Sequence, residues 1–244
     1  MTTLAIRTDL IADLPDEAKE QLRTYRDLIL HWNQRFNLTA VTDPEAADHR
    51  LTGDALRLVP VIDDVLAKRP NAFRMIDLGT GAGLPGLVLK IARPQLNVTL
   101  VDATHKKVRF VQHVIDELGL TGVRTIHGRA EDLGHMIDYR QQFAIGTARA
   151  VAALPTLLEL LLPLLETDAA FILPKGGDID DELKQGKRAA HTLGGRVEHA
   201  ELLPGTSDEP VTRVVRGVKI ASTPSRYPRR AGIPNREPLG REGR

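Results

Sequence analysis

Hydrophobic side chains in the first quarter of the chain recur at helical spacing. One apolar stripe is formed by residues three or four positions apart: Leu22, Tyr25, Ile29, Trp32 and Phe36. Pro15 begins this segment, and acidic residues fill its first turn, as the helix dipole favours. The pattern also predicts a second helix from Pro44 to about Leu66. We therefore expect an N-terminal helical cap over residues 1–68, with its aromatic stripe packed onto the main domain.

From residue 69 to residue 220, short apolar runs alternate with helical segments, which is typical of a parallel sheet with helices on both faces. Five such strands are predicted: Phe73–Leu78, Asn97–Asp102, Val123–His127, Gln142–Thr147 and Ala169–Leu173. The helices between and after them are Leu84–Ala92, Lys106–Leu118, Leu154–Leu165 and Asp180–Leu193. Two further β-rich runs, Val197–Leu203 and Val211–Ile220, predict a closing antiparallel pair. The fold class expected is therefore α/β.

Composition narrows the class of protein. With 244 residues, 42% hydrophobic and 27% charged, the chain suits one large α/β domain with an added subdomain. No apolar run approaches the length of a membrane span and no signal peptide is recognisable, so we expect a cytoplasmic monomer that does not bind membranes. The absence of cysteine excludes disulfides, zinc-thiolate sites and methyl transfer that begins with cysteine attack. The eight histidines are scattered, and we predict no metal.

The glycine-rich turn after the first predicted strand carries the strongest functional signal. Gly79, Gly81 and Gly83 follow the strand, and glycines there let main-chain N–H groups approach a ligand closely. Asp77, two positions before the first glycine, suits a cationic amino group, whereas its carboxylate would repel a pyrophosphate. S-adenosylmethionine has a charged amine, a sulfonium and no phosphate. The turn, including Thr80, therefore predicts a methyl-donor site.

Two other interpretations of the same residues stay open. Gly81–Gly86 also fits the G-x-G-x-x-G pattern of nicotinamide dinucleotide sites, although that pattern alone is weak. A tight turn without a ligand is the third interpretation. Asp102 ends the next strand, 23 residues after Gly79, and could hydrogen-bond the ribose of either cofactor. Local chemistry favours the methyl donor.

Polar groups gather where the predicted strands end. In open parallel sheets the ligand lies beyond the carboxyl ends of the strands. Five such ends carry candidate groups: Gly79, Asp102, the loop 128–131, Arg149 and Lys175. We expect them to form one site, in which Asp77 and Asp102 bind the donor and contribute little to the stability of the fold.

The end of the chain is basic. Residues 221–244 hold six arginines and two glutamates, while the whole chain has a net charge of only +1. Such asymmetry favours a tail that contacts an anionic partner, and a solubilising terminus is the alternative.

Several of these segments together resemble one family, the bacterial small-subunit (16S) rRNA guanine-N7 methyltransferases, known as RsmG or GidB. The resemblance spans nearly the whole chain. Its most specific parts are Trp32–Pro44, Ala148–Ala150 and Tyr227–Asn235, and it also includes the turn Asp77–Gly86, Asp102–Phe110 and Leu173–Gly176. The resemblance implies a class I, Rossmann-like fold that uses S-adenosylmethionine, and rRNA or the small ribosomal subunit as partner.

Carried over by position, the resemblance also implies site residues. Gly79 and Leu84 would line the donor site, Asp102 would hold the ribose, Ala130 and Glu131 would flank the adenine, and Arg149 would lie beside donor and target. RNA contacts are expected at Asn37, Lys175, Arg226, Arg229 and Arg230. One departure is visible: members usually carry a Lys-His pair where this chain has Arg50 and Leu51, so an RNA contact of that histidine would be absent or moved to His49.

Methylation of guanine N7 needs no general base, because this nitrogen has a lone pair and no proton. The fourth predicted strand ends in Thr147-Ala-Arg-Ala-Val151 and lacks the Asn/Asp-Pro-Pro-aromatic loop that grips an exocyclic amine. Arg149 could donate to guanine O6 or to a phosphate, or could instead form an ion pair with Glu131 or Asp132. A non-catalytic rRNA-binding assembly factor and a nicotinamide-dependent oxidoreductase remain as alternative functions.

Overall fold

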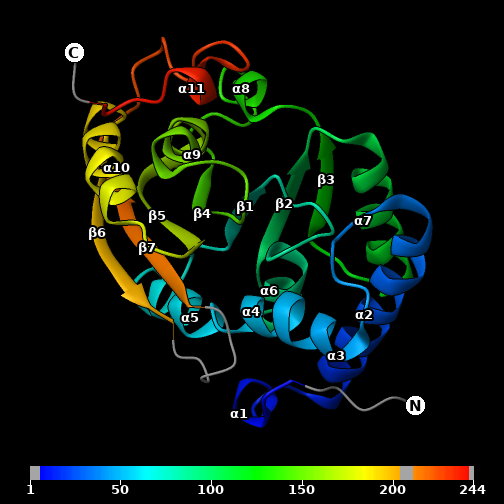
Figure 1. The fold of residues 1–244 in the computed structure, drawn as a ribbon. Helices are drawn as coiled ribbons and strands as arrows, with labels where there is room; N and C mark the ends of the chain where they lie inside the picture. Colours follow the sequence, from blue (N-terminus) through cyan, green and yellow to red (C-terminus); the bar gives the residue numbers. More distant parts are fainter. Residues whose placement is uncertain (1–5, 204–210, 242–244) are drawn as a thin grey trace.

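The computed structural model describes residues 6–203 and 211–241. Within these residues a seven-stranded sheet has the order β3-β2-β1-β4-β5-β7-β6 (Figure 1). Its strands are β1 Arg74–Leu78, β2 Asn97–Asp102, β3 Val123–His127, β4 Phe143–Ala148, β5 Leu165–Gly176, β6 Gly195–Leu202 and β7 Thr212–Lys219. The first five strands pair in parallel, and β7 pairs antiparallel with both β5 and β6. The predicted α/β fold with a closing antiparallel pair is confirmed.

Helices cover both faces of the sheet (Figure 1). One face packs against α2 Asp16–Phe36, α5 Val59–Lys68, α6 Gly86–Ala92 and α7 His105–Glu117. The other packs against α8 Ala130–Leu133, α9 Leu154–Leu161 and α10 Asp180–Thr192. Successive strand side chains point to opposite faces, so Met75 joins the first core and Ile76 the second. The short helices α1 Thr8–Ile11 and α11 Ile233–Arg236 lie near the two ends of the chain.

The aromatic stripe of the cap packs as predicted except at its end, where Phe36 is exposed. Leu22, Tyr25 and Ile29 are fully buried and share one core with the sheet, α6 and α7. Trp32 lies against Phe110 of α7, with 5.4 Å between the ring centroids. The cap and the main domain therefore share one hydrophobic core, and the division of the chain at residue 68 remains a prediction from sequence.

The single second cap helix predicted from Pro44 to Leu66 is wrong. The chain instead forms α3 Pro44–Ala47, a π-helix η1 Asp48–Gly53, α4 Asp54–Leu56 and α5. Pro60 has no N–H to bond the carbonyl group one helical turn before it. The helix is therefore interrupted after Leu56 and restarts as α5, with Pro60 in its first turn. The short helix α4 contacts α6, the helix that follows the glycine turn.

The leucine-rich helix is also shorter than predicted, and the strand after it is longer. The helix α9 ends at Leu161 and passes into a 3₁₀ turn, η2 Leu162–Leu164, that contains Pro163. The strand β5 then begins at Leu165 and not at Ala169. Its pairing with β4 shifts register between Phe143 and Ile145, where the polar residues 166–168 bulge out of the ladder. Those polar residues hid the start of the strand in the sequence pattern.

Candidate active site

The turn after β1 has backbone angles that only glycine adopts readily. Gly79, Gly81 and Gly83 have φ angles of +64°, +62° and +98°. A side chain is also excluded by space at two of them. A Cβ on Gly79 would lie 2.5 Å from Val151 Cγ2, and a Cβ on Gly83 would lie 2.4 Å from Leu87 Cδ1. Gly79 and Gly83 therefore allow close packing of the turn, whereas a Cβ on Gly81 would meet nothing closer than the Gly79 carbonyl oxygen at 3.9 Å.

Asp77 holds this turn together through one of its two carboxylate oxygens. The Thr80 hydroxyl and the Gly86 N–H donate to Oδ2 at 2.7 and 3.0 Å. The other oxygen, Oδ1, is buried and has no hydrogen-bond partner among the described residues. Burial, with a smaller effect from the charge of Asp102, raises the pKa of Asp77 to about 7. A buried carboxylate oxygen without a hydrogen-bond donor is suited to bind an ammonium group.

We expect Asp77 to make stability depend on pH. Because its pKa is higher in the folded chain than the usual 3.8, the folded state binds more protons than the unfolded state between about pH 4 and pH 7. The free energy of unfolding should therefore fall as pH rises through this window and level off above it. The contribution should vanish in Asp77→Asn, so urea unfolding of both proteins at several pH values measures it. Parallel pH profiles for the two proteins would contradict the assignment.

Asp102 connects the turn to the neighbouring strand. Its Oδ2 accepts from the Gly81 N–H at 3.0 Å, and its Oδ1 accepts from the Thr104 N–H at 2.8 Å. Each carboxylate oxygen can accept more than one hydrogen bond, so both remain able to receive ribose hydroxyls. The expectation that Asp77 and Asp102 contribute little to stability stays a prediction, and it has to be tested against the four hydrogen bonds that they accept from the glycine turn, Gly86 and Thr104.

Tyr25 was predicted only as part of the core, yet it also contacts the turn. Its fully buried hydroxyl donates to the Ala82 carbonyl oxygen at 2.6 Å. This bond ties the cap helix α2 directly to the glycine turn. No sequence signal separates Tyr25 from the other residues of the apolar stripe, since it occurs at the same helical spacing.

Arg149 lies at the end of β4, half-buried at the wall of a cavity of about 310 Å³. Its guanidinium donates to the Arg50 carbonyl oxygen at 3.3 Å. Within the described residues it forms neither of the ion pairs considered above, with Glu131 or Asp132. Ala150, the next residue, has a φ of +55°, and this costly conformation turns the chain directly after Arg149. The cavity is bounded by the cap, the glycine turn and β5; it is lined by Asp54, Leu58, Pro85, Arg149, Lys175 and Glu182, among others.

Lys175 reaches the same cavity from the end of β5. Its ammonium group pairs with Glu182 of α10 at 2.5 Å and donates to the Ala152 carbonyl oxygen at 2.9 Å. Asp54, the other acid on the wall, is paired with Arg57 at 3.1 Å. The two acids of this wall are thus both held by cations.

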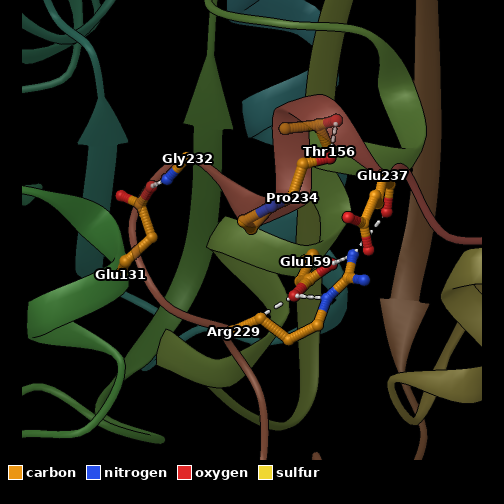
Figure 2. A network of polar contacts seen from close by, with 7 residues as sticks. All are labelled: Glu131, Thr156, Glu159, Arg229, Gly232, Pro234 and Glu237. Atoms are coloured by element: carbon orange, nitrogen blue, oxygen red, sulfur yellow. Dashed lines mark hydrogen bonds and ion pairs between the residues drawn. The ribbon is translucent and has the colours of Figure 1, made fainter.

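The loop after β3 completes the row of strand ends. The Gly128 N–H donates to the Asp102 carbonyl oxygen at 3.1 Å, which places residues 128–131 beside Asp102. Ala130 and Leu84 are buried, and Glu131 is half-buried. Figure 2 shows that Glu131 also receives the Gly232 N–H of the C-terminal tail, at 3.2 Å. No local pattern in the sequence indicates this contact.

The residues predicted to bind RNA differ in how far their side chains are exposed to solvent. Arg229 is half-buried, and its guanidinium forms a fork with Glu159, which is fully buried (Figure 2). Its donors are engaged within the protein, so Arg229 is left out of the proposed RNA interface. Arg226 and Arg230 are exposed, and Arg226 lies over the Tyr227 ring at 5.1 Å. Asn37 is exposed at the end of α2. Residues 242–244 of the tail lie outside the described residues.

The departure at Leu51 has a structural counterpart. Leu51 is a buried residue of η1 and belongs to the hydrophobic core, so this position faces the protein interior. Its neighbours His49 and Arg50 are half-buried and exposed, and the Arg50 carbonyl oxygen accepts from Arg149. His49 therefore remains the candidate for a moved RNA contact.

Among the described residues, no helix combines the length and apolar character needed to cross a bilayer. The same residues contain no cluster of histidine and acidic side chains that could hold a metal ion.

The fold and the site define a class of protein. The sheet resembles that of magnesium protoporphyrin IX methyltransferase from Synechocystis, solved with bound S-adenosylmethionine (TM-score 0.54, 12% identity, covering 80% of this chain and 97% of that chain). The unpaired Asp77 Oδ1 suits the amine of that cofactor, and the Asp102 carboxylate beside the Gly81 N–H suits its ribose. The chain therefore has the fold of the class I methyltransferases, with acidic residues placed to suit S-adenosylmethionine.

Sequence comparison gives the family. Residues 18–209 match the GidB family model, described as rRNA small subunit methyltransferase G. Proteins named ribosomal RNA small subunit methyltransferase G are 45% identical in Chloroflexus aggregans and 41% identical in Leuconostoc citreum. These alignments cover 93% of this chain and 92–93% of the relatives. The chain belongs to this family, which decides for the methyl donor and against the nicotinamide cofactor.

Proposed function

We propose that this protein transfers a methyl group from S-adenosylmethionine to N7 of a guanine in small-subunit rRNA. Relatives at 45% and 41% identity are named as small-subunit rRNA methyltransferases, which supports rRNA as the substrate. The observation that carries the finer proposal is the cavity at the ends of β4 and β5. It contains the Arg149 guanidinium, and its two acids are already paired. A wall of this kind offers hydrogen-bond donors, and both of its carboxylates are engaged by cations, which suits a reaction that needs no general base.

Such a wall suits the electronic demands of N7 methylation. The N7 lone pair attacks the methyl carbon, the carbon–sulfur bond breaks, and its electron pair returns to sulfur. The positive charge passes from the sulfonium to the purine, and no proton leaves N7. An arginine that donates to O6, beside N7, would orient the base in its plane and leave N7 open to the donor.

Positioning would then supply most of the rate enhancement. Holding N7 in line with the sulfonium methyl can lower the barrier by roughly 7–11 kcal/mol. When bound, S-adenosylmethionine supplies the electrophilic methyl group, and the residues of this chain bind, orient and exclude water. Because N7 in a helix is partly covered, we expect a loop or helix-end guanine, or one displaced from its stack. Residence in the cytoplasm and a monomeric state stay predictions.

The proposal is tested by incubating the protein with S-adenosylmethionine carrying a labelled methyl group and rRNA from a strain that lacks its gene. We expect label in small-subunit rRNA and none with wild-type rRNA, where the position is already filled. Donor binding measured in parallel against NADH separates the classes. Binding of rRNA without donor binding or label would instead favour a non-catalytic assembly factor.

The exposed tail arginines should govern the salt dependence of RNA binding. Arg226 and Arg230 are free to contact phosphates, whereas Arg229 is engaged by Glu159. Replacing both exposed arginines by alanine should therefore flatten the log–log salt slope of RNA affinity by up to about two units. A salt titration of RNA binding measures this, with Arg196→Ala on β6, outside the tail, as a control that removes the same charge. An unchanged slope would remove the tail from the RNA interface.

A further inference from the structure

The C-terminal tail is anchored to the main domain by a buried charge. Glu159 is the one acid inside the apolar helix α9, and it is 0% exposed. The Arg229 backbone N–H and Nε donate to its Oε1 at 2.9 and 2.8 Å, and Arg229 Nη2 donates to its Oε2 at 2.7 Å (Figure 2). Arg229 Nη2 also reaches the Glu237 carbonyl oxygen at 2.7 Å. A buried carboxylate satisfied by three donors from one residue fixes the course of the tail at that point.

Beyond this anchor the tail turns toward the strand ends. Gly232, with a φ of +83°, donates its N–H to Glu131 Oε1 at 3.2 Å. The Thr156 hydroxyl of α9 donates to the Pro234 carbonyl oxygen at 2.8 Å (Figure 2). The contact to Glu131 is thus held on both sides by bonds to α9, and Gly232 is presented to Glu131 from a fixed segment.

The tail also packs against the other end of α8. A Cβ on Gly134 would lie 2.5 Å from Pro228 Cδ, so only glycine allows this approach. His135 Nε2 lies 2.7 Å from the Pro228 carbonyl oxygen, and Arg140 donates to the Tyr227 carbonyl oxygen at 2.9 Å. The tail therefore contacts both ends of the short segment 131–140.

The segment held in this way borders the nucleoside end of the donor site. Residues 128–131 follow β3, and the Gly128 N–H is bonded to the Asp102 carbonyl oxygen. In a parallel sheet the end of β3 is next to the end of β2, where Asp102 faces the position of a ribose. A four-residue helix such as α8 has few internal hydrogen bonds and needs outside contacts to stay in place.

We propose that the tail segment 227–237 is a clamp that positions Glu131 for the adenosine moiety of the methyl donor, with Arg229 and Glu159 as its positioning residues. This rests on the proposed donor site. The sequence alone placed the tail on RNA and gave it no part in donor binding. Loss of the anchor between Arg229 and Glu159 should weaken the hydrogen bond from Gly232 to Glu131. The short helix α8 would then lose one of the contacts that hold it in place.

The test is the affinity of the full chain for S-adenosylmethionine and for adenosine. Arg229→Ala combined with Glu159→Gln removes the anchor without leaving a buried charge unpaired. Without the anchor, one or two hydrogen bonds to the bound ligand should be lost. Both dissociation constants should therefore rise by about 5- to 10-fold. The KM for the donor should rise to match, while kcat at saturating donor stays within about twofold. Arg241→Ala, an exposed arginine of the same tail outside the clamp segment, is the matched control and should change neither constant.

A double-mutant cycle tests whether the clamp acts through Glu131. Glu131→Ala should raise both dissociation constants, and adding it to the anchor variant should raise them little further. If the anchor variant fails to fold, Thr156→Val removes the second fixing point and should show a smaller increase of the same kind. Unchanged affinities, or fully additive effects, would overturn the clamp. Failure of the unmodified protein to bind either ligand would instead overturn the proposed donor site.

Discussion

Replacing Arg149 by alanine should reduce kcat for rRNA methylation by at least about 100-fold, the usual loss when one preorganised donor to the reacting group is removed. Arg149 lines the wall of the cavity, and its guanidinium makes only a long hydrogen bond within the described residues, to the Arg50 carbonyl oxygen at 3.3 Å. The fold should survive because the side chain is only half-buried. Steady-state kinetics with circular dichroism of the same sample measure both quantities.

The control for this variant is Arg196→Ala, which removes the same charge from an exposed site on β6. It should retain normal turnover. Arg149→Lys should recover only part of the activity, since an ammonium group cannot reproduce the planar fork of a guanidinium. Near-normal turnover of the alanine variant would show that Arg149 has only a structural role, and would contradict the proposed hydrogen bond from Arg149 to the base.

Asp102→Ala should weaken S-adenosylmethionine binding by about 1–3 kcal/mol, the order expected for hydrogen bonds to a charged group. This variant should also unfold more easily, because the Gly81 and Thr104 N–H groups would lose their acceptor. Asp102→Asn keeps one oxygen and separates the two effects. Titration calorimetry with the donor, together with thermal unfolding, measures them.

Asp77→Asn provides the comparison within the same site. It keeps an acceptor for Thr80 and Gly86 but removes the charge that would face the donor amine. It should weaken S-adenosylmethionine binding and leave adenosine binding nearly unchanged, whereas Asp102→Asn should weaken both. Equal donor affinity in all these variants and the unmodified protein would contradict the assignment of both acids.

The sheet and its ligand edge were predictable from sequence because they depend on local signals. The strands β2 and β3 were predicted at their observed bounds, since uninterrupted β-forming runs end at polar residues there. The positions of Asp77, Asp102 and Arg149 followed from strand ends meeting at one edge of a parallel sheet. The break at Pro60 was missed because the apolar spacing continues across it.

The tail was the largest departure from the sequence-based expectation. Its arginines look alike in the sequence, and only the fold brings Arg229 to Glu159, 70 residues away. The signal that could have suggested this pairing was the acid itself, since a glutamate among leucines in a buried helix requires a cationic partner. The partner's position could not be read from local pattern, because it depends on how the chain returns after β7.

The most direct test of the central claim is mass spectrometry of nucleosides from 16S rRNA. The rRNA would come from a strain lacking the gene, before and after incubation with the protein and S-adenosylmethionine, and with Arg149→Ala in parallel. We expect 7-methylguanosine to be restored by the unmodified protein and not by the variant. A methyl group on any other atom, or no methylation despite donor binding, would contradict the account.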